Sequence, residues 1–270
     1  MKNFNTIIEK KLPFNNKINL ILFQGDSCSG KTTFSTFLYK NLKKTENCSI
    51  IHLDDYYRSF DSPKTEAEVA DYDFDNPAAF DWEALEATLY DYAYRRKHVV
   101  LRKRDITTKT SRSETIINNY PKILILEGIY AFNLINPYCF NIKNLDPFRP
   151  PENHLDHLIF TKNPLNLYRL FNLLKIRFEL DKTLLKDIRL KRDVRFGFTK
   201  EEINHTLESY VLPGISKWNL NQMNQSDILI KNGTFNDSEC NELIDKICSF
   251  YHLKGIKLDF YKKTGEFKMA

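Results

Sequence analysis

The chain has 270 residues, of which 42% are hydrophobic, so it can form one sizeable core at the upper size limit of a single domain. Its five cysteines include no Cys-x-x-Cys pair, which argues against a disulfide framework and a zinc site. No segment resembles a signal peptide or reaches the roughly 18 apolar residues of a membrane span, which argues against a membrane partner and favours a cytoplasmic protein. The net charge of +5 is concentrated in two basic clusters, within 95–104 and 189–195, which suit small phosphorylated molecules better than nucleic acid because no nucleic-acid-binding motif accompanies them.

A phosphate-binding loop is the strongest local signal in the sequence. An apolar strand is predicted over 18–23, and a helix is predicted after residue 33 from apolar residues at helical spacing. Between them lies a Gly-x-x-x-x-Gly-Lys-Thr segment, in which backbone N–H groups and the positive end of the helix surround a polyphosphate. The predicted nucleotide-binding residues of this segment are Gly25, Asp26, Ser27, Cys28, Ser29, Gly30, Lys31, Thr32 and Thr33.

Two further strands are predicted to end in carboxylates. A buried strand over 49–53 ends at Asp54-Asp55, and a continuous apolar strand over 122–126 ends at Glu127. Open α/β sheets bind ligands at the carboxyl ends of their strands. We therefore expect Gly25, Asp54 and Glu127 to converge on one crevice.

A long loop, a helix and a strand are predicted between these two strands. Residues 59–80 are polar and indicate a loop of the length that usually carries function. Asp81 is a predicted N-cap, and a strand over 98–101 is expected to run into the basic segment 102–112. The inner face of the helix is predicted to carry Trp82, Leu85, Leu89 and Tyr92.

The second half of the chain is predicted to continue the alternation of strands and helices. A loop over 146–151 and a strand over 156–160 precede a helix that begins at Asn163-Pro164. An arginine-bearing helix ends near 195–197, and Thr199 with Glu202 forms a capping box for the next helix. A short strand over 227–230 and a helix over 240–248 follow. The apolar residues of the helix after Asn163 are expected to be Leu167, Leu170, Phe171 and Leu174.

This alternation predicts an α/β protein with a P-loop nucleotide-binding fold: a mostly parallel central sheet with helices on both faces and a helical lid. We expect one domain over 1–270, with its core at about 18–250 and its lid at about 181–199. The tail 251–270 remains unassigned.

The residues that converge at the crevice suit phosphoryl transfer. That reaction needs positioning, Mg²⁺, cations on the migrating group and a carboxylate that orients the nucleophile. Lys31 is expected to contact the β- and γ-phosphates, Thr32 and Glu127 to form the metal environment, and Asp54 to accept the proton of an acceptor hydroxyl. Arg189, Arg192 and Arg195 are expected to close over ATP as a lid; the alternative for them is a solvated helix face.

Successive motifs resemble those of the uridine kinase and phosphoribulokinase family of P-loop kinases, and the resemblance covers roughly 20–232. The matching segments, in order, are Gly25–Thr33, Asp54–Arg58, Tyr72–Asp81, Leu126–Phe132, Arg192-Asp193 with Arg195, Tyr210–Pro213 and Ser226–Ile230.

The resemblance implies an ATP-dependent kinase with a P-loop core and a mobile lid. By match of motif, Asp54 corresponds to the general base, Tyr57 lines the acceptor site, and Asp75 corresponds to the carboxylate that holds ribose hydroxyls. Arg192 corresponds to a lid arginine. A helix cap for Asp54 and a turn-forming role for Asp75 are the structural alternatives. Members of the nucleoside branch often form homo-oligomers, so this chain could form one.

Two departures from the family pattern concern the acceptor and the lid. Where uridine kinases carry a tyrosine and a histidine that contact the base, this chain has Arg104 and Lys109, and both are cations. Charge-assisted hydrogen bonds from these cations favour an acidic or phosphorylated acceptor. The lid segment Arg195–Gly197 lacks the arginine that many members place directly before the glycine.

The expected function is therefore a kinase that uses ATP and Mg²⁺ to phosphorylate a primary hydroxyl of a small molecule, foremost the 5′-hydroxyl of uridine or cytidine. A sugar-phosphate or other acidic-metabolite kinase of the same family is the alternative that Arg104 and Lys109 support. A third alternative, from another class, is a catalytically weak nucleotide-binding module. We expect neither nucleic acid nor a membrane among its partners.

Overall fold

A computed structural model describes residues 17–59, 72–105, 108, 110–133, 138–140, 158–160, 167–219, 226–231 and 237–251. Lys109, most of the loop expected over 59–80, the loop over 146–151, the helix start at Asn163-Pro164 and the tail after 251 lie outside these residues. Within the described part of the chain, no helix combines the length and the apolar character that a membrane crossing requires.

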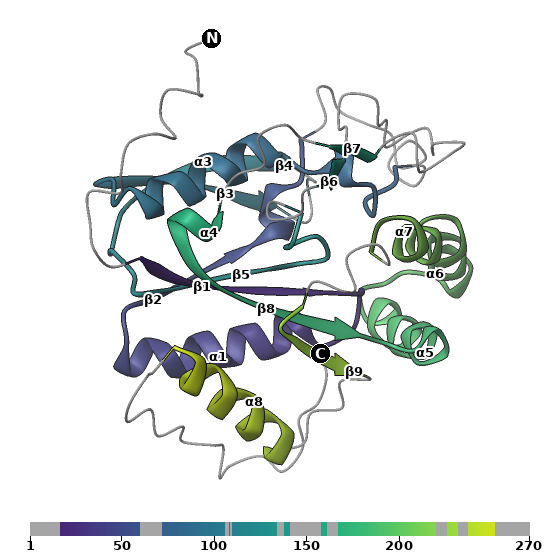
Figure 1. The fold of residues 1–270 in the computed structure, drawn as a ribbon. Coiled ribbons are helices and arrows are strands. Elements are labelled where there is room, and N and C mark those ends of the chain that lie inside the picture. Colours follow the sequence, from purple (N-terminus) through teal and green to yellow (C-terminus); the bar gives the residue numbers. More distant parts are fainter. Residues whose placement is uncertain are drawn as a thin grey trace.

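Five of the described strands form one parallel sheet in the order β2-β5-β1-β8-β9 (Figure 1). The central strand β1 (Ile18–Gly25) leads into the phosphate-binding loop and then into helix α1 (Lys31–Thr45). This arrangement confirms the predicted α/β class and places the carboxyl ends of the strands at one edge of the sheet. The other strands of this sheet are β2 (Cys48–His52), β5 (Ile123–Gly128), β8 (Phe171–Glu179) and β9 (Ile228–Lys231).

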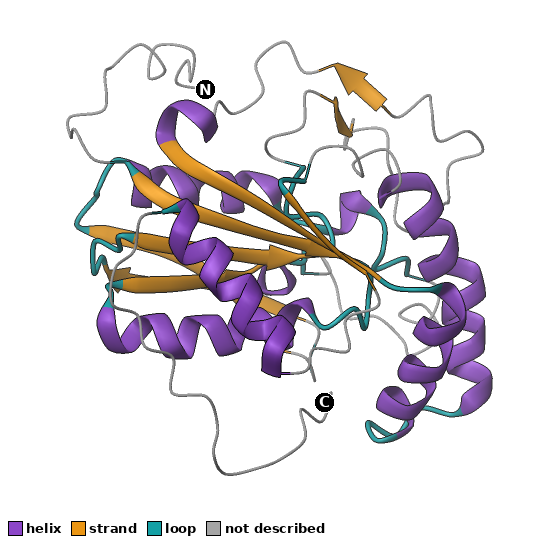
Figure 2. Ribbon diagram, turned by 60° about the horizontal axis from the view of Figure 1, so that its bottom comes forward, coloured by secondary structure: helices purple, strands orange, loops and turns teal. Residues whose placement is uncertain are grey.

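Helices cover both faces of the sheet. Alternate residues of the buried strands face opposite sides, so both faces are apolar and each packs against helices. Leu20 and Leu22 of β1 pack with α3 (Trp82–Ala93) on one face. Ile21 and Phe23 pack with α1 and α8 (Asp237–Phe250) on the other. Figures 1 and 2 show α1 and α8 together on the face opposite α3. Every residue of β5 is buried, as expected for a strand enclosed by helices.

Two of the predicted helix caps, at Asp81 and Thr199, are confirmed. Asp81 accepts a hydrogen bond from the backbone N–H of Ala84 at the start of α3. Thr199 and Glu202 form the reciprocal capping box at the start of α6 (Lys200–Thr206). Satisfying these N–H groups fixes where each helix begins.

The prediction that the strand after α3 belongs to the central sheet is wrong. Residues 98–105 and 110–117 instead form an antiparallel hairpin, β3 (His98–Asp105) with β4 (Thr110–Ile117), which is separate from the parallel sheet. Most of β4 is exposed, as is usual for an antiparallel pair with one solvated face. The strand expected over 156–160 is present as β7 (Leu158–Phe160), but it pairs with β6 (Tyr138–Phe140) and not with the central sheet.

The prediction of a helix that continues through residue 174 is also wrong. A single helical turn, α4 (Leu167–Leu170), leads directly into β8, which pairs with β1 from Phe171 to Phe178. The apolar positions that fit a helical period are also consistent with a strand buried on both faces. Arg177 is buried within β8 and forms an ion pair with Glu179 at 3.3 Å.

A helical unit lies beyond the carboxyl edge of the sheet. Helix α5 (Lys182–Val194) packs with α6 and the segment after it through a small apolar cluster that includes Leu185, Ile203 and Leu207. After α6 the chain continues through α7 (Leu212–Gly214), with a wide helical turn on each side of it. In Figure 1 these helices stand together at the end of β8. The unit places one side of α5 against the phosphate-binding loop.

Candidate active site

A cavity of about 250 Å³ lies at the carboxyl ends of β1 and β2. The phosphate-binding loop forms one wall, the segments after β2 and β5 form another, and α5 closes a third. Its lining brings together Lys31, Asp54 and Arg192, the three predicted catalytic residues. The lining residues are Ser27, Cys28, Gly30, Lys31, Thr32, Thr33, Asp54, Tyr57, Phe74, Asp75, Ile129, Ile188, Arg189 and Arg192.

The backbone of the phosphate-binding loop is shaped by tight local geometry. Gly30 adopts a φ of 87°, and Cys28 adopts a left-handed φ of 62°. Gly25 must lack a side chain, because a Cβ there would lie 2.5 Å from the carbonyl oxygen of Phe178 in β8. These constraints hold the loop against the sheet and turn it sharply into α1.

The start of α1 is suited to bind an anion. It has no side-chain cap and no acidic residue in its first turn, so its N–H groups and positive end remain available. The Ser29 hydroxyl is buried and has no hydrogen-bond partner among the described residues. Asp26 is buried, and its carboxylate accepts the N–H of Leu180 at 3.5 Å, so it acts as a support for the loop.

Glu127 joins the phosphate-binding loop to β2. Its Oε2 accepts the Thr32 hydroxyl at 3.0 Å, and its Oε1 lies 2.7 Å from Nδ1 of His52. Burial alone would raise the pKa of Glu127, but His52, Lys31 and Thr32 hold it below its usual value. In turn, the hydrogen bond to Glu127 raises the pKa of His52. His52 was not predicted as part of the site, although it ends a strand beside Asp54.

The two adjacent aspartates at the end of β2 have different surroundings. Asp54 faces the cavity, whereas Asp55 accepts the backbone N–H of Arg104 at 3.1 Å and Nζ of Lys103 at 3.3 Å. The Asp54 carboxylate opens to the cavity, but burial by the surrounding protein raises its pKa, and the negative charge of Glu127 raises it further. Lys31 and Arg104 oppose this rise. Of these two aspartates, Asp54 is therefore the one placed to contact a ligand in the cavity.

Aromatic side chains enclose the side of the cavity near Asp75. Tyr57 stacks on Phe80 with 4.2 Å between ring centroids, and its edge-on neighbour is Phe74. The backbone carbonyl of Asp75 accepts the hydroxyl of Tyr130, while its carboxylate lines the cavity. Burial raises the pKa of Asp75, and Arg189, Lys31 and Arg192 act in the opposite direction. Phe74 was not predicted as a site residue, although it lies inside the motif Tyr72–Asp81.

The arginines of α5 divide into two that reach the cavity and one that does not. Arg189 donates to the Ser27 hydroxyl at 3.2 Å, so α5 touches the phosphate-binding loop directly. The Asp193 carboxylate lies 3.1 Å from Nε of Arg189 and 2.6 Å from Nε of Arg192, which orients both guanidinium groups. Arg195 is exposed at the end of α5 and is absent from the cavity lining, so its predicted place beside ATP is not seen.

Arg104 approaches the site from the β3–β4 hairpin. Its guanidinium carbon lies 4.1 Å from the centroid of the Tyr57 ring and 5.0 Å from that of Phe74. It does not itself line the cavity, but the two rings that it covers do. Lys109, the second predicted base-contacting cation, lies outside the described residues.

Asp73 is a buried carboxyl beneath the site, and its burial predicts a pH-dependent stability. Burial and the neighbouring Asp75 raise its pKa from 3.8 to about 7. Because the folded-state pKa lies above the unfolded one, ionisation of Asp73 costs stability progressively as pH rises from about 4 to about 7, by up to about 4 kcal/mol. Asp73→Asn should therefore raise the melting temperature at pH 8 and leave it nearly unchanged at pH 4.5.

The matched control for this measurement is Asp187→Asn, which changes an exposed aspartate on α5. Its effect on the melting temperature should be small and similar at both pH values. An Asp73→Asn effect that did not depend on pH would contradict a buried, strongly perturbed carboxyl.

The residues of the cavity fit ATP and Mg²⁺. The Thr32 hydroxyl donates a hydrogen bond to Glu127, which leaves the lone pairs of the hydroxyl oxygen directed elsewhere and available to a cation. Among the described residues, no group of three His, Cys, Asp or Glu side chains is gathered to hold a metal. Mg²⁺ is commonly held by one or two protein oxygens together with the phosphates, and Thr32 and Glu127 offer such oxygens.

Comparison with known proteins shows which family this chain resembles. Residues 20–147 match the model of the Phosphoribulokinase / Uridine kinase family. The chain is 36% identical over 110 residues to a uridine kinase of Mycoplasma pneumoniae, which covers 41% of the chain and 51% of that relative. It is 25% identical over 249 residues to uridine-cytidine kinase B of Dictyostelium discoideum, which covers 92% and 86%. The chain spans about half the length of the first curated relatives that it matches.

A solved structure gives the same result for the fold. The structure of the YGR205w protein superposes with a TM-score of 0.58 at 20% identity, over 81% of this chain and 87% of that one. The strand order, the phosphate-binding loop and these matches all indicate the same P-loop fold. Residues 20–147 of this chain are thus similar to the phosphoribulokinase and uridine kinase family.

Proposed function

We propose that this chain is a kinase that uses ATP and Mg²⁺ to phosphorylate the primary 5′-hydroxyl of a pyrimidine ribonucleoside. The observation that carries the proposal is the convergence of Lys31, the Thr32–Glu127 pair and Asp54 on one cavity. The acceptor class is supported by the relatives, which are named uridine kinase and uridine-cytidine kinase.

One half of the cavity is suited to the phosphates of ATP. Lys31 and the first turn of α1 would hold the β- and γ-phosphates, and Arg189 and Arg192 would approach them from α5. Thr32 and Glu127 would hold Mg²⁺, which neutralises charge on the phosphates when it is bound. We further propose that residues 181–199 act as a lid on a core of about 18–250, because α5 carries the cations that complete this half.

The other half is suited to a neutral acceptor with several hydroxyls. Asp54 would accept the proton of the 5′-hydroxyl as its oxygen attacks the γ-phosphorus and the bond to ADP breaks. Asp75 would accept hydrogen bonds from ribose hydroxyls, and the Tyr57 and Phe74 rings would contact the base. Lys31 and Arg104 favour the ionised form of Asp54, which is the form that a base requires.

The test is Mg-ATP-dependent ADP release from the purified chain with uridine, cytidine or a sugar phosphate as acceptor. We expect release with the nucleosides that exceeds the acceptor-free rate by at least roughly tenfold, because water lacks the contacts to Asp75 and to the rings. Release only with the sugar phosphate would move the assignment to an acidic acceptor. Tight ATP binding without any acceptor-dependent release would replace the kinase by a nucleotide-binding module.

A further inference from the structure

The Arg104 guanidinium is held as a flat, fixed group beside the acceptor half of the cavity. Phe80 covers one face of the Tyr57 ring at 4.2 Å between centroids, so Arg104, at 4.1 Å from the same centroid, must take the opposite face. Phe74 contacts the guanidinium as well. A guanidinium packed on aromatic rings is oriented by its plane and directs its N–H groups outward from the edge.

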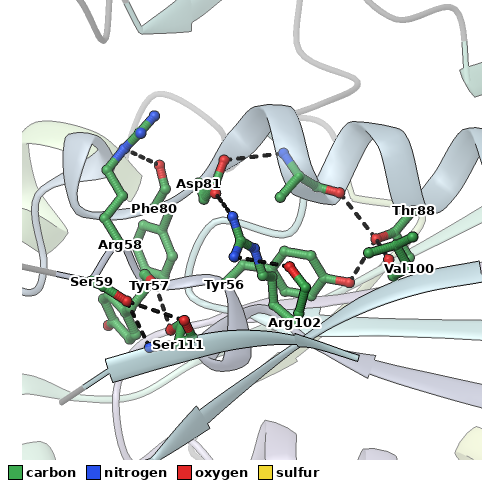
Figure 3. A network of polar contacts seen from close by, with 12 residues as sticks. Tyr56, Tyr57, Arg58, Ser59, Phe80, Asp81, Thr88, Val100, Arg102 and Ser111 are labelled. Carbon is green, nitrogen blue, oxygen red and sulfur yellow. Dashed lines mark hydrogen bonds and ion pairs between the residues drawn. The ribbon is translucent and has the colours of Figure 1, made fainter. Parts of the chain in front are cut away.

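The hairpin that carries Arg104 is fastened to the acceptor segment at several points. Ser111 of β4 donates to the carbonyl of Tyr57 at 2.7 Å and also bonds Ser59. Arg102 of β3 forms an ion pair with Asp81 at 2.6 Å. Figure 3 shows these contacts joining the hairpin, the segment after β2 and the start of α3. Arg104 is thus placed before any ligand arrives, which reduces the entropy lost on binding.

The hydrogen-bonding capacity of Arg104 is not used up within the protein. Its backbone N–H donates to Asp55, but its Nη1 is buried and has no hydrogen-bond partner among the described residues. A buried N–H without a partner is unfavourable, so an acceptor atom from a ligand bound beside Tyr57 and Phe74 would satisfy it. A guanidinium has only donors, so it can pair only with groups that present acceptor atoms.

The charges nearby argue against an anionic acceptor group. Asp54 and Asp75 both face the cavity, and the charge of Arg104 already interacts with Asp54 and Asp55. In the proposed complex, Lys31, Arg189 and Arg192 are engaged by ATP. Among the described residues, an acidic acceptor would therefore meet two carboxylates against one cation, whereas a neutral ring with acceptor atoms would not be repelled.

We propose that Arg104 sets the base preference of the acceptor site and selects cytosine over uracil. The inference rests on the proposed nucleoside kinase function. The exposed edge of cytosine offers two adjacent acceptors, N3 and O2, which match the two-donor edge of a guanidinium. In uracil, N3 carries a proton and faces the guanidinium as a donor against a donor. Bidentate pairs of this kind discriminate between bases by roughly tenfold or more.

The experiment measures kcat/KM for cytidine and for uridine in direct competition, with wild type, Arg104→Gln, Arg104→Lys and Arg112→Gln. The glutamine amide offers one donor and one acceptor, so it can pair with uracil. Arg104→Lys keeps the charge but loses the planar fork. Arg112 is exposed on the same hairpin, so Arg112→Gln is the matched control for the lost charge.

We expect wild type and Arg112→Gln to favour cytidine by roughly tenfold, and both Arg104 variants to bring the ratio close to one or below it. The ratio does not depend on the fraction of active protein, so a partly unfolded variant still gives a result. Turnover with an unchanged ratio in Arg104→Gln would overturn this inference and leave the kinase function intact. A wild-type preference for a carboxylated nucleoside such as orotidine over cytidine would overturn it in favour of an anionic acceptor. Absence of turnover with every nucleoside would overturn the proposed function and this inference with it.

Discussion

Replacing Asp54 with asparagine is expected to lower kcat by about 10²- to 10⁴-fold, the range over which a positioned base contributes. The amide keeps the shape and a hydrogen-bond acceptor at the cavity wall but cannot take a proton. Affinity for ATP should change little, because the phosphate-binding residues belong to another wall of the cavity. Single-turnover measurements with saturating ATP, together with ATP titration by calorimetry, separate the two effects.

Asp55→Asn is the matched control, since it makes the same change one residue further along the chain. Asp55 is directed to the hairpin, where its oxygens accept from Arg104 and Lys103. Asparagine can retain the bond to the Arg104 N–H, so we expect a loss of kcat smaller than about tenfold. Equal losses in both variants would show that the two carboxylates act as a unit and would contradict the assignment of Asp54 alone.

Replacing Lys31 with methionine is expected to lower kcat/KM for ATP by at least 10²- to 10³-fold, the usual effect of removing one preorganised group from developing charge. Lys31 is buried at the start of α1 and lines the cavity. Methionine retains much of the apolar stem and removes the cation. The loss of this charge should also raise the pKa of Asp54 further, because Lys31 opposes the rise that burial causes.

The control for Lys31 is Lys40→Met, which removes an exposed lysine from the same helix. Its kinetics should equal those of wild type within about twofold, because an exposed charge at that distance is largely screened. Lys31→Met with near-normal turnover would exclude the phosphate-binding loop from the reaction.

The parts of the fold that the sequence predicted are those in which local pattern and global structure agree. The strand, loop and helix around Lys31 carry a spacing that few other structures satisfy. The positions of Asp54 and Glu127 followed from one rule, that parallel strands place their carboxyl ends together. The helix caps at Asp81 and Thr199 depend on neighbouring residues only, so they too could be predicted.

The parts that could not be predicted depend on contacts between distant residues. The start of β8, where Phe171 and Leu174 predict a helix, has apolar positions that fit both periods, and only pairing with β1 decides between them. The role of Asp55 depends on where the β3–β4 hairpin packs, which no local pattern encodes. The place of His52 in the site could not be predicted for the same reason, because its partner Glu127 lies on a neighbouring strand.

The most direct test of the proposed function is phosphorus NMR of the products formed from Mg-ATP and cytidine. We predict stoichiometric ADP and a new phosphomonoester resonance, split by coupling to the two 5′-methylene protons, in amounts that grow with cytidine. ATP consumption that yields only inorganic phosphate, or a phosphomonoester coupled to a single ribose proton, would contradict transfer to the primary hydroxyl.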